Sequence, residues 1–310
     1  MKKKILVIKH GALGDMIFGL AAFKALRDHH QNDQLILLTT SPFLEFAEKS
    51  GLFDAVWVDD RKKLWNSPAS WWALLKKLRQ EKFDRVYDLQ RSHRTGWYFR
   101  LMRLFFHPLP EWSGTAKGSS HYYNTPSLYE KHILDHNKEQ LAITGIHNVP
   151  PPSLDWMKPS ISGLHLPKKY FLLVPGCSPT QPHKRWPAEK YGEIAQKLVK
   201  KKITPVIIGS ESEKEIAEVI QKACPKAVTL LGKTTLFQLP ELARGAQGAL
   251  GGDTGPIHMI SLSHCPSLML FSYSSNPLLC GPQDGISQVI FRPALTDVKV
   301  DEVWKDLRFR

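Results

Sequence analysis

KILVIKHGALGD, the stretch Lys4–Asp15, predicts how the chain begins to fold. Its apolar run has the length of one buried strand and stops at Lys9. Two glycines, Gly11 and Gly14, then allow the backbone to turn tightly. A helix is expected directly afterwards, over Met16–Asp28. A strand, a glycine turn and a helix in this order are typical of a parallel sheet covered by helices.

The same alternation of strand-length and helix-length stretches continues along the chain and predicts an α/β protein. Strands are expected at Lys4–Lys9, Gln34–Thr39, Ala55–Val58, Arg85–Asp88, Tyr170–Val174, Thr204–Ile208, Ala227–Leu231, Ala246–Gly251 and Ser267–Phe271. Helices are expected at Met16–Asp28, Pro42–Lys49, Pro68–Gln80, Leu128–Gly145, Pro187–Lys201, Glu211–Ala223, Leu236–Arg244 and Gly255–Ser263. A less regular segment, about His107 to Pro126, is expected to form a loop or insertion over the sheet edge.

A proline-rich segment separates two such series. Five prolines lie between His147 and Pro167, and proline at this density continues neither a helix nor a central strand. We therefore predict one doubly wound domain over residues 1–150, a linker over 151–167 and a second doubly wound domain over 168–310. The two domains are expected to face one another across a cleft, with the last helix packing back on the first domain.

Charge and composition narrow the class of protein. Lysine and arginine number 42 against 29 acidic residues, a formal net charge of +13 that favours nucleic acid, an anionic membrane face or a phosphorylated substrate as partner. The four cysteines form no C-x-x-C pair, which argues against a zinc site and favours a reducing compartment. No apolar run reaches the length of a membrane helix or a signal peptide, so a cytoplasmic location is expected.

Ligands of doubly wound sheets bind beyond the carboxyl ends of the strands, so the loops at that edge carry the candidate chemistry. After the first strand, Asp15 at a helix start is a candidate to take a proton from an attacking hydroxyl. The alternative is a carboxylate that only complements the helix dipole. In a later loop, Lys184 and Arg185 precede a helix beginning at Pro187, where they either neutralise a diphosphate or form a solvated pair.

Two further loops have the same placement. Gly209–Glu213 puts acids at a helix start, which suits hydrogen bonds to ribose hydroxyls, although N-capping by Ser210 or Ser212 explains it nearly as well. Gly251–His258, GGDTGPIH, ends a strand with small residues and opens a helix. The free N–H groups of that helix N-terminus suit a nucleotide diphosphate. His258, one turn into the helix, either faces the ligand or is a core histidine.

These motifs together resemble glycosyltransferase family 9, the heptosyltransferases that build the inner core of lipopolysaccharide. The resemblance runs over nearly the whole chain, and its first and last motifs, in this order and separation, are strongly specific. The motifs are KILVIKHGALGD at Lys4–Asp15, DLQ at Asp88–Gln90, PGCS and KRWP within Pro175–Pro187, GSESE at Gly209–Glu213 and DTGPIH at Asp253–His258.

The resemblance implies an inverting transferase of the GT-B type, with two Rossmann-like domains and without a catalytic metal or other cofactor. The donor would be ADP-heptose, bound mainly to the C-terminal domain. By position, Asp15 resembles the catalytic base, Lys184 the diphosphate contact and Glu213 the acid that holds the ribose. The other candidate donor-binding residues are Gly14, Asp253, Thr254, Gly255 and His258.

Two stretches depart from the family pattern. Met259–Cys265 stands where the family usually has small apolar residues and a glycine, and Ser272–Asn276 replaces the more usual Gly-Pro-Thr. Because these stretches border the donor pocket, a family 9 transferase that uses another nucleotide sugar is kept as an alternative.

In the implied mechanism, Asp15 deprotonates the acceptor hydroxyl as it attacks the anomeric carbon, while Lys184 and the helix N-terminus after Thr254 stabilise the leaving diphosphate. The family's N-terminal domain receives a phosphorylated, acidic glycolipid at the inner face of the membrane. Candidate contacts with this acceptor are Arg61, Lys62, Lys63, Arg91 and Arg94.

The cations near Trp65, Trp71 and Trp72 also suit peripheral attachment to an anionic inner-membrane surface. Arg100 and Arg103 fit this interpretation and solvated positions on a helix equally well. A monomer is expected.

Three other classes of protein are alternatives. A nucleic-acid-binding protein suits the charge, but basic residues interleaved with stacking aromatics in a recognised module are not found, so no nucleic-acid partner is expected. A nucleotide-sugar epimerase of the same architecture needs no second acceptor. A sugar-binding relative without activity is disfavoured by the presence of Asp15 and Lys184.

Overall fold

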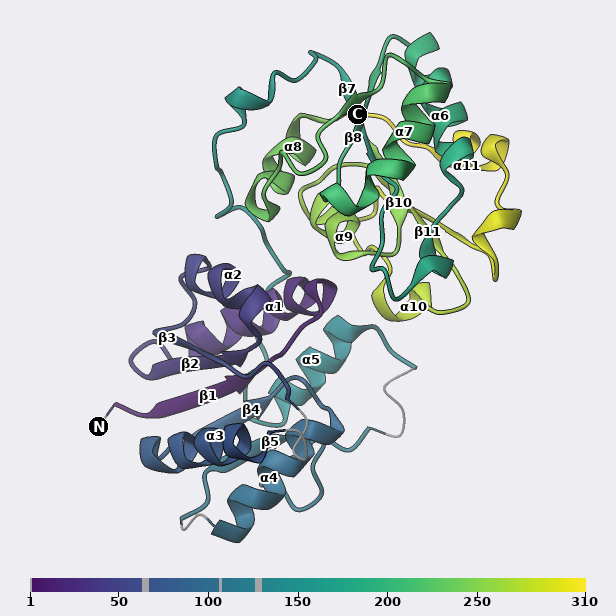
Figure 1. Cartoon of the computed structure of the whole chain (residues 1–310). Coiled ribbons are helices and arrows are strands. Elements are labelled where there is room, and N and C mark those ends of the chain that lie inside the picture. Colours follow the sequence, from purple (N-terminus) through teal and green to yellow (C-terminus); the bar gives the residue numbers. More distant parts are fainter. Residues whose placement is uncertain (1, 63–66, 106–107, 126–129) are drawn as a thin grey trace. The chain divides into compact units, whose positions relative to one another are not determined.

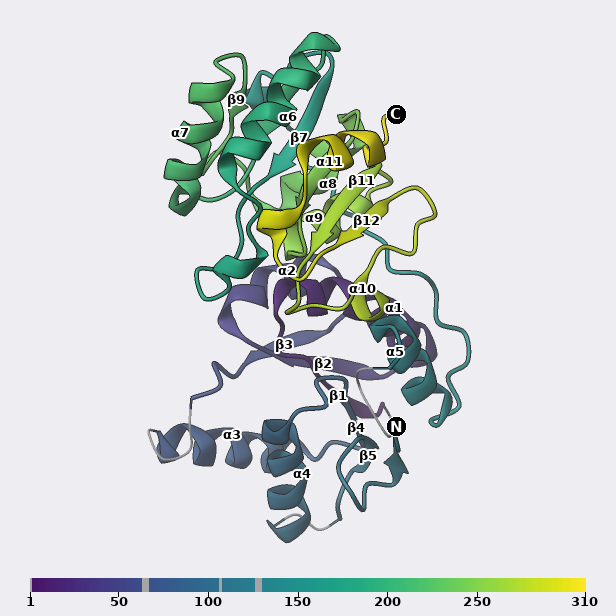
Figure 2. The same cartoon turned by 90° about the vertical axis from the view of Figure 1, so that its right-hand side faces the viewer.

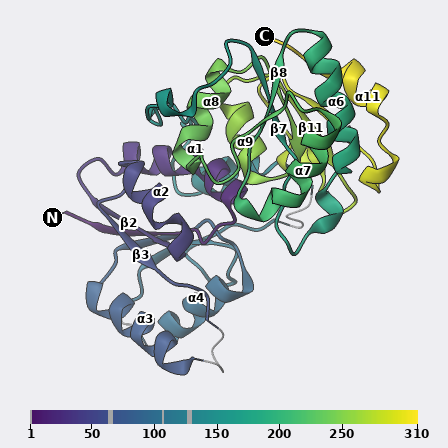
Figure 3. The same cartoon turned by 45° about the horizontal axis from the view of Figure 1, so that its top comes forward.

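The computed structural model describes residues 2–62, 67–105, 108–125 and 130–310. The chain forms two compact units, Met1–Pro152 and Ser153–Arg310. Each unit is built around a twisted parallel sheet with helices on both faces (Figures 1, 2 and 3). The α/β class with two doubly wound domains is therefore confirmed.

Within the described residues, the first sheet has six parallel strands and the second has six. The first runs in the order β3 (Ala55–Val58), β2 (Gln34–Thr39), β1 (Lys4–Ile8), β4 (Arg85–Asp88), β5 (Glu111–Gly114) and β6 (His121–Tyr122). The second runs β12 (Gln288–Phe291), β11 (Ser267–Phe271), β10 (Ala249–Gly252), β7 (Tyr170–Val174), β8 (Thr204–Ile207) and β9 (Val228–Thr229).

The two sheets share one topology. Numbered within its own unit, each has the order 3-2-1-4-5-6 when read from the matching edge, so the direction of winding reverses between β1 and β4 and between β7 and β10. Ligands of such sheets bind outside the carboxyl ends of the strands at this switch point. The loops after these four strands are therefore where each unit is expected to bind its ligand.

The helices follow the strands in chain order. The first unit has α1 (Leu13–His29), α2 (Leu44–Lys49), α3 (Pro68–Glu81), α4 (His93–Phe105) and α5 (Ile133–Ala142). The second has α6 (Ala188–Lys200), α7 (Lys214–Ala223), α8 (Leu239–Gly245), α9 (Gly255–Leu262), α10 (Pro277–Cys280) and α11 (Val300–Asp306). Short 3-10 turns lie at Ser41–Phe43, Ser162–Leu164, Pro182–Lys184, Glu211–Glu213, Leu236–Gln238 and Leu295–Asp297.

The core of the first unit fixes which helices lie on which face. Leu6 and Ile8 of β1 pack in one cluster with Tyr98 and Met102 of α4 and Leu78 of α3. Because successive strand residues point to opposite faces, the intervening residues of β1 face the other layer, where α1 and α5 pack together (Figure 1). In this arrangement α3 and α4 form one layer of the first unit.

Two regions of the sheets differ from the sequence prediction. The segment expected to be a loop, about His107 to Pro126, contains β5 and β6, while His107 and Pro126 themselves lie outside the described residues. Its strands are short and polar in composition, yet Trp112 and Ser113 are fully buried by pairing with β4. Sheet edges of this length have too little periodicity to be recognised. The four-residue edge strand β12 was missed for the same reason.

The helix predicted over Leu128–Gly145 begins later. Residues 126–129 lie outside the described part of the chain, and the structure starts α5 at Ile133. The N-cap is His132, whose Nδ1 accepts a hydrogen bond from the Leu134 N–H at 3.2 Å. Histidine is not among the residues usually expected at this position, so the sequence did not mark the start.

Much of the predicted linker over 151–167 packs on the second unit. Leu154 and Met157 are buried. Their carbonyl oxygens accept hydrogen bonds from the guanidinium of Arg244 in α8, at 2.9 Å and 2.8 Å respectively. The Arg244 guanidinium thus holds the backbone of this proline-rich segment against the second unit.

The last helix packs on the second unit, where Val303 and the following Leu307 lie in the core. The expected packing of α11 on the first domain stays a prediction. The connection before the helix is fixed there too, because the Trp186 Nε1–H donates to the Val298 carbonyl at 3.1 Å. The apolar side of α11 is therefore buried beside α6.

Candidate functional site

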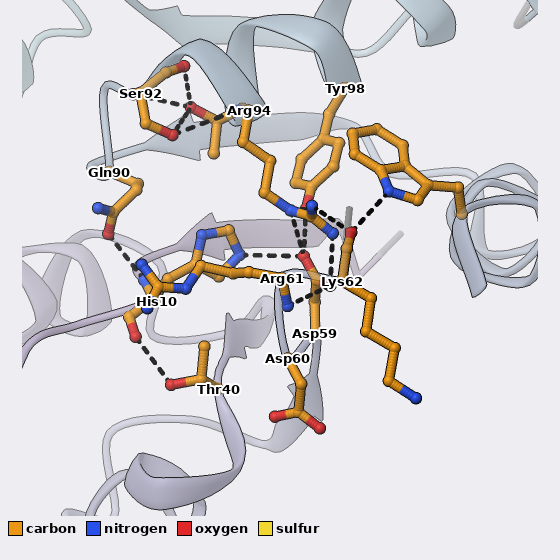
Figure 4. Close-up of polar contacts among 12 residues, drawn as sticks. His10, Thr40, Asp59, Asp60, Arg61, Lys62, Gln90, Ser92, Arg94 and Tyr98 are labelled. Atoms are coloured by element: carbon orange, nitrogen blue, oxygen red, sulfur yellow. Dashed lines mark hydrogen bonds and ion pairs between the residues drawn. The ribbon is translucent and has the colours of Figure 1, made fainter. Parts of the chain in front are cut away.

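In the first unit, the loops after β1 and β4 meet at the switch point. The Gln90 Oε1 accepts a hydrogen bond from the His10 N–H at 2.8 Å, which ties the two loops together (Figure 4). Gly11 has φ +100°, and a Cβ there would lie 2.1 Å from the Phe43 ring. Only glycine suits both this conformation and this close approach. The GALGD turn and the DLQ segment therefore form one structure.

Asp15 lies in the first turn of α1 at this switch point, one residue after Gly14. Its side chain is 41% exposed, so it is accessible to a ligand. The buried Lys9 places its Nζ 3.4 Å from Asp15 Oδ1 and donates to the Leu89 carbonyl at 3.3 Å. Burial lowers the pKa of Lys9, and the Asp15 charge opposes that shift.

Lys9 was not predicted as a site residue. In the sequence, Lys9 stands out only as a charged residue at the end of an apolar strand, two positions before Gly11. Its Nζ lies within ion-pair distance of the accessible Asp15 carboxylate, so Lys9 helps to hold that carboxylate at the switch point.

Arg91, predicted as an acceptor contact, is buried instead. Its guanidinium donates to Asn137 Oδ1 at 3.0 Å and to Gln140 Oε1 at 3.3 Å, both in α5. Its backbone N–H donates to Asp88 Oδ1 at 3.0 Å. Burial raises the pKa of Asp88 to about 6. Arg91 therefore anchors α5 to the loop after β4.

Arg94, which was also predicted as an acceptor contact, makes its hydrogen bonds within the unit as well (Figure 4). Its Nη2 and Nε donate to the two carboxylate oxygens of Asp59 at 2.8 Å and 3.0 Å. The Tyr98 hydroxyl donates to the same carboxylate. Burial alone raises the pKa of Asp59, but these donors outweigh it and the pKa is lowered. His10 lies against this group, and burial lowers its pKa to about 4, so His10 is neutral at pH 7.

The Arg94–Asp59 pair holds the loop after β3. Arg94 Nη1 donates to the Lys62 carbonyl at 2.8 Å, and the Arg61 N–H donates to Asp59 Oδ1 at 3.1 Å. The side chains of Arg61 and Lys62 are exposed, so they are available to an anionic ligand. Lys63 lies outside the described residues. Of the predicted acceptor contacts, two are therefore exposed and two are engaged inside the unit.

In the second unit, the loops after β7 and β10 meet in the same way. Lys184 Nζ lies 2.6 Å from Asp253 Oδ2, across 69 positions of sequence. His258 Nε2 lies 2.8 Å from Asp253 Oδ1. All three side chains are largely buried. Gly252 allows the approach, because a Cβ there would lie 2.5 Å from the Lys184 carbonyl oxygen.

The charge of Asp253 is stabilised by these partners. Burial alone raises the pKa of Asp253, but the His258 hydrogen bond and the Lys184 ammonium outweigh it and hold the pKa well below its usual value. A carboxylate whose folded pKa is depressed contributes stability above its unfolded pKa, and that contribution is lost as the pH falls.

We therefore predict that acid destabilises the wild type more than Asp253→Asn. Between pH 6 and pH 3, the free energy of urea unfolding should fall by about 1 kcal/mol more in the wild type, because the linkage contribution of a strongly paired aspartate is lost only below its unfolded pKa of about 3.9. Asp301→Asn, at an exposed carboxylate paired with Lys197, is the control and should keep the wild-type slope. Equal slopes for the wild type and Asp253→Asn would contradict the assignment.

The N-terminus of α9 opens beside this group. Thr254 is its N-cap and Gly255 its first residue. Thr254 Oγ1 is buried, makes no cap to the helix and has no hydrogen-bond partner among the residues that the structure describes. An unsatisfied hydroxyl together with free N–H groups and the positive end of the helix dipole suits an anion.

Glu213 lies in the loop after β8 and serves as a cap. Its Oε2 accepts hydrogen bonds from the Ser210 N–H at 2.7 Å and the Ser210 hydroxyl at 2.6 Å. The side chain fills the space beside Gly176, where a Cβ would lie 2.6 Å from Glu213 Cγ. The capping interpretation is thus correct for Ser210, and the carboxylate sits next to the backbone of the loop after β7.

The first unit thus brings Gly14 and Asp15 to its switch point, and the second brings Lys184, Asp253, Thr254, Gly255 and His258 to its own. Glu213 follows the neighbouring strand β8. Among the described residues, no group of three or more His, Cys, Asp or Glu side chains could hold a metal ion. Nor does the described part of the chain contain a helix long and apolar enough to span a membrane.

Comparison with known proteins identifies relatives of this arrangement. The sequence model of glycosyltransferase family 9 (heptosyltransferase) matches residues 71–290. Lipopolysaccharide heptosyltransferase 2 of Escherichia coli K12 is 24% identical over 311 residues, which cover 88% of this chain and 83% of that protein. Lipooligosaccharide heptosyltransferase 2 of Haemophilus influenzae is 27% identical over 99 residues, a match that spans 30% of this chain and 29% of that protein. The solved structure of E. coli ADP-heptose lps heptosyltransferase II superposes with a TM-score of 0.75 at 18% identity, covering 99% and 97% of the two chains.

Proposed function

The chain belongs to glycosyltransferase family 9 (heptosyltransferase), and from this membership we propose that it transfers a heptose from ADP-heptose to a lipopolysaccharide inner-core acceptor with inversion at the anomeric carbon. The observation that carries the proposal is the Lys184–Asp253–His258 group at the N-terminus of α9. Lys184 supplies a cation there, Thr254 an unsatisfied hydroxyl and α9 its N–H groups, as a diphosphate leaving group would need.

The proposed reaction is a direct displacement. The acceptor oxygen forms a bond to the anomeric carbon as the bond from that carbon to the diphosphate oxygen breaks. Asp15 takes the acceptor's proton, and the electron pair leaves on the diphosphate. Lys184, Thr254 and the N–H groups of α9 stabilise the new negative charge, so no metal ion or other cofactor is required in this scheme.

Different observations support the proposed donor and the proposed acceptor. The E. coli protein that shares this fold is an ADP-heptose heptosyltransferase, and Glu213 lies at the strand edge where a ribose would bind. For the acceptor, the exposed Arg61 and Lys62 on the loop held by Asp59 suit the phosphates of an acidic glycolipid. Such an acceptor would place the protein in the cytoplasm, peripherally associated with the inner face of the cytoplasmic membrane.

A ligand screen tests the proposal. Thermal shift of the whole protein is measured with ADP-heptose and with other ADP-, GDP- and UDP-sugars. ADP-heptose should raise the melting temperature most, because at equal concentration the ligand with the lowest Kd stabilises the folded state most. At 100 times its Kd a ligand contributes about 2.7 kcal/mol. Release of ADP with an inner-core acceptor should follow. A preference for UDP-sugars would overturn the donor assignment.

A further inference from the structure

Helix α4 is apolar on two sides. On one side, Tyr98 and Met102 lie in the core of the first unit. On the other, Trp97 is 53% exposed and Leu104 is 67% exposed. Positions 97, 100 and 104 follow the spacing of one helical stripe, so Trp97, Arg100 and Leu104 share the solvent side. A surface helix normally carries polar residues there.

Helix α3 extends this surface. Trp72 is 62% exposed, and its ring packs near that of Phe105 of α4, which is 43% exposed, with centroids 6.1 Å apart. The two helices pack in one layer on the first sheet (Figures 1 and 2). Trp72 and Phe105 thus lie side by side across the two helices, while Trp97 and Leu104 occupy the solvent side of α4. We call these four exposed residues the α3–α4 apolar face.

The cations around this face are not balanced by acids on the same helices. Arg100 and Arg103 of α4 and Lys76 and Arg79 of α3 are cationic, and α4 carries no acidic residue. The Arg100 guanidinium lies 5.0 Å from the Trp97 ring centroid. The acid at the end of α3, Glu81, is paired with Lys4 at 2.6 Å.

Large apolar side chains edged by cations match the chemistry of an anionic bilayer surface. Tryptophan and leucine enter the boundary between headgroups and acyl chains, and arginine and lysine remain with the phosphates. A second copy of the chain suits this face less well, because pairing would bring Arg100 and Arg103 of both copies together.

We propose that the α3–α4 apolar face is the surface by which the protein binds an anionic phospholipid bilayer. The inference rests on the proposed function insofar as a lipid-linked acceptor gives such binding a purpose. The residues of this face agree only in part with the tryptophans that the sequence indicated, Trp65, Trp71 and Trp72. Trp71 is buried, with its Nε1–H donating to the Lys62 carbonyl at 2.9 Å, whereas the neighbouring Trp72 faces solvent; Trp65 lies outside the described residues.

Vesicle cosedimentation tests this surface with the whole protein and no substrate. Large unilamellar vesicles of phosphatidylcholine alone are compared with vesicles containing phosphatidylglycerol. Binding to the anionic vesicles should be at least roughly tenfold stronger, because each cation near the surface adds to the attraction. Added salt should weaken it.

Two variants separate the contributions of apolar and charged groups. The double variant Trp97→Ser with Leu104→Ser should lower partitioning to the anionic vesicles about tenfold, since both side chains are exposed and their loss removes apolar contact. Arg100→Ala with Lys76→Ala should remove most of the preference for anionic lipid. Ile143→Ser, at a residue 45% exposed elsewhere in the same unit, is the control and should bind as the wild type does.

Each contrary outcome is decisive. Equal binding to the two kinds of vesicle, or unchanged binding by the Trp97 and Leu104 variant, would overturn the proposal. So would a dimer in sedimentation that this variant converts to monomer, since the face would then join two copies. The thermal shift with ADP-heptose should be the same in all variants; its absence in the wild type would count against the proposed function and leave the vesicle result standing.

Discussion

Asp15→Asn is expected to lower kcat by roughly 10²- to 10⁴-fold, the range that general-base catalysis contributes. The amide keeps the size of the carboxylate and accepts no proton from the acceptor hydroxyl. Asp15 is partly exposed at the switch point of the first unit, beside the buried Lys9. Lys184 and Asp253 lie in the second unit, so donor affinity should change little.

The measurement pairs ADP release under acceptor saturation with calorimetric titration of ADP-heptose. Asp28→Asn is the matched control, because Asp28 lies in the same helix and pairs on the surface with Lys24. It should leave both measurements as in the wild type. Near-normal turnover in Asp15→Asn would remove the residue from the role of base.

Lys184→Met is expected to lower kcat/KM by about 10²- to 10³-fold, the cost of removing one group that stabilises developing charge. Stability should fall as well. Asp253 loses its closest cation, and removing one partner of a buried ion pair typically costs about 3–5 kcal/mol. The remaining His258 contact and proton uptake by Asp253 should keep the loss toward the lower end.

Lys197→Met is the matched control for Lys184→Met. Lys197 pairs with Asp301 at 2.9 Å on the surface, where such pairs contribute little. Its melting temperature and kcat/KM should stay close to those of the wild type. Lys184→Arg keeps the charge and separates catalysis from stability: stability should recover more than kcat/KM, because the planar fork does not reproduce the ammonium position. Unchanged kcat/KM in Lys184→Met would exclude Lys184 from the diphosphate site.

Several elements could be predicted because their signals are local. The strands Gln34–Thr39, Tyr170–Val174 and Ser267–Phe271 have the predicted bounds, since a short apolar run between turn residues specifies a buried parallel strand. β5 and β6 could not be predicted, because their residues become strand by pairing with β4 and with each other.

The roles of Arg91 and Arg94 could not be predicted from the sequence. A basic residue near a strand end looks the same in sequence whether it faces solvent or an internal acid. Arg91 is buried on two amides of α5, and Arg94 is held by Asp59. Both sets of partners lie at least 35 positions away in the chain. The sequence therefore indicated cations in this region without telling which of them are exposed.

The sequence by itself determined the α/β class, the doubly wound pattern and the loops that carry the candidate site, because strand length, glycine turns and helix starts depend on near neighbours. Only the tertiary structure decided that Lys184 pairs with Asp253, that Lys9 lies beside Asp15, and that Trp72 and Trp97 are on the surface. These are contacts and exposures set by how the strands are ordered in each sheet, and strand order is a long-range property that no local stretch encodes.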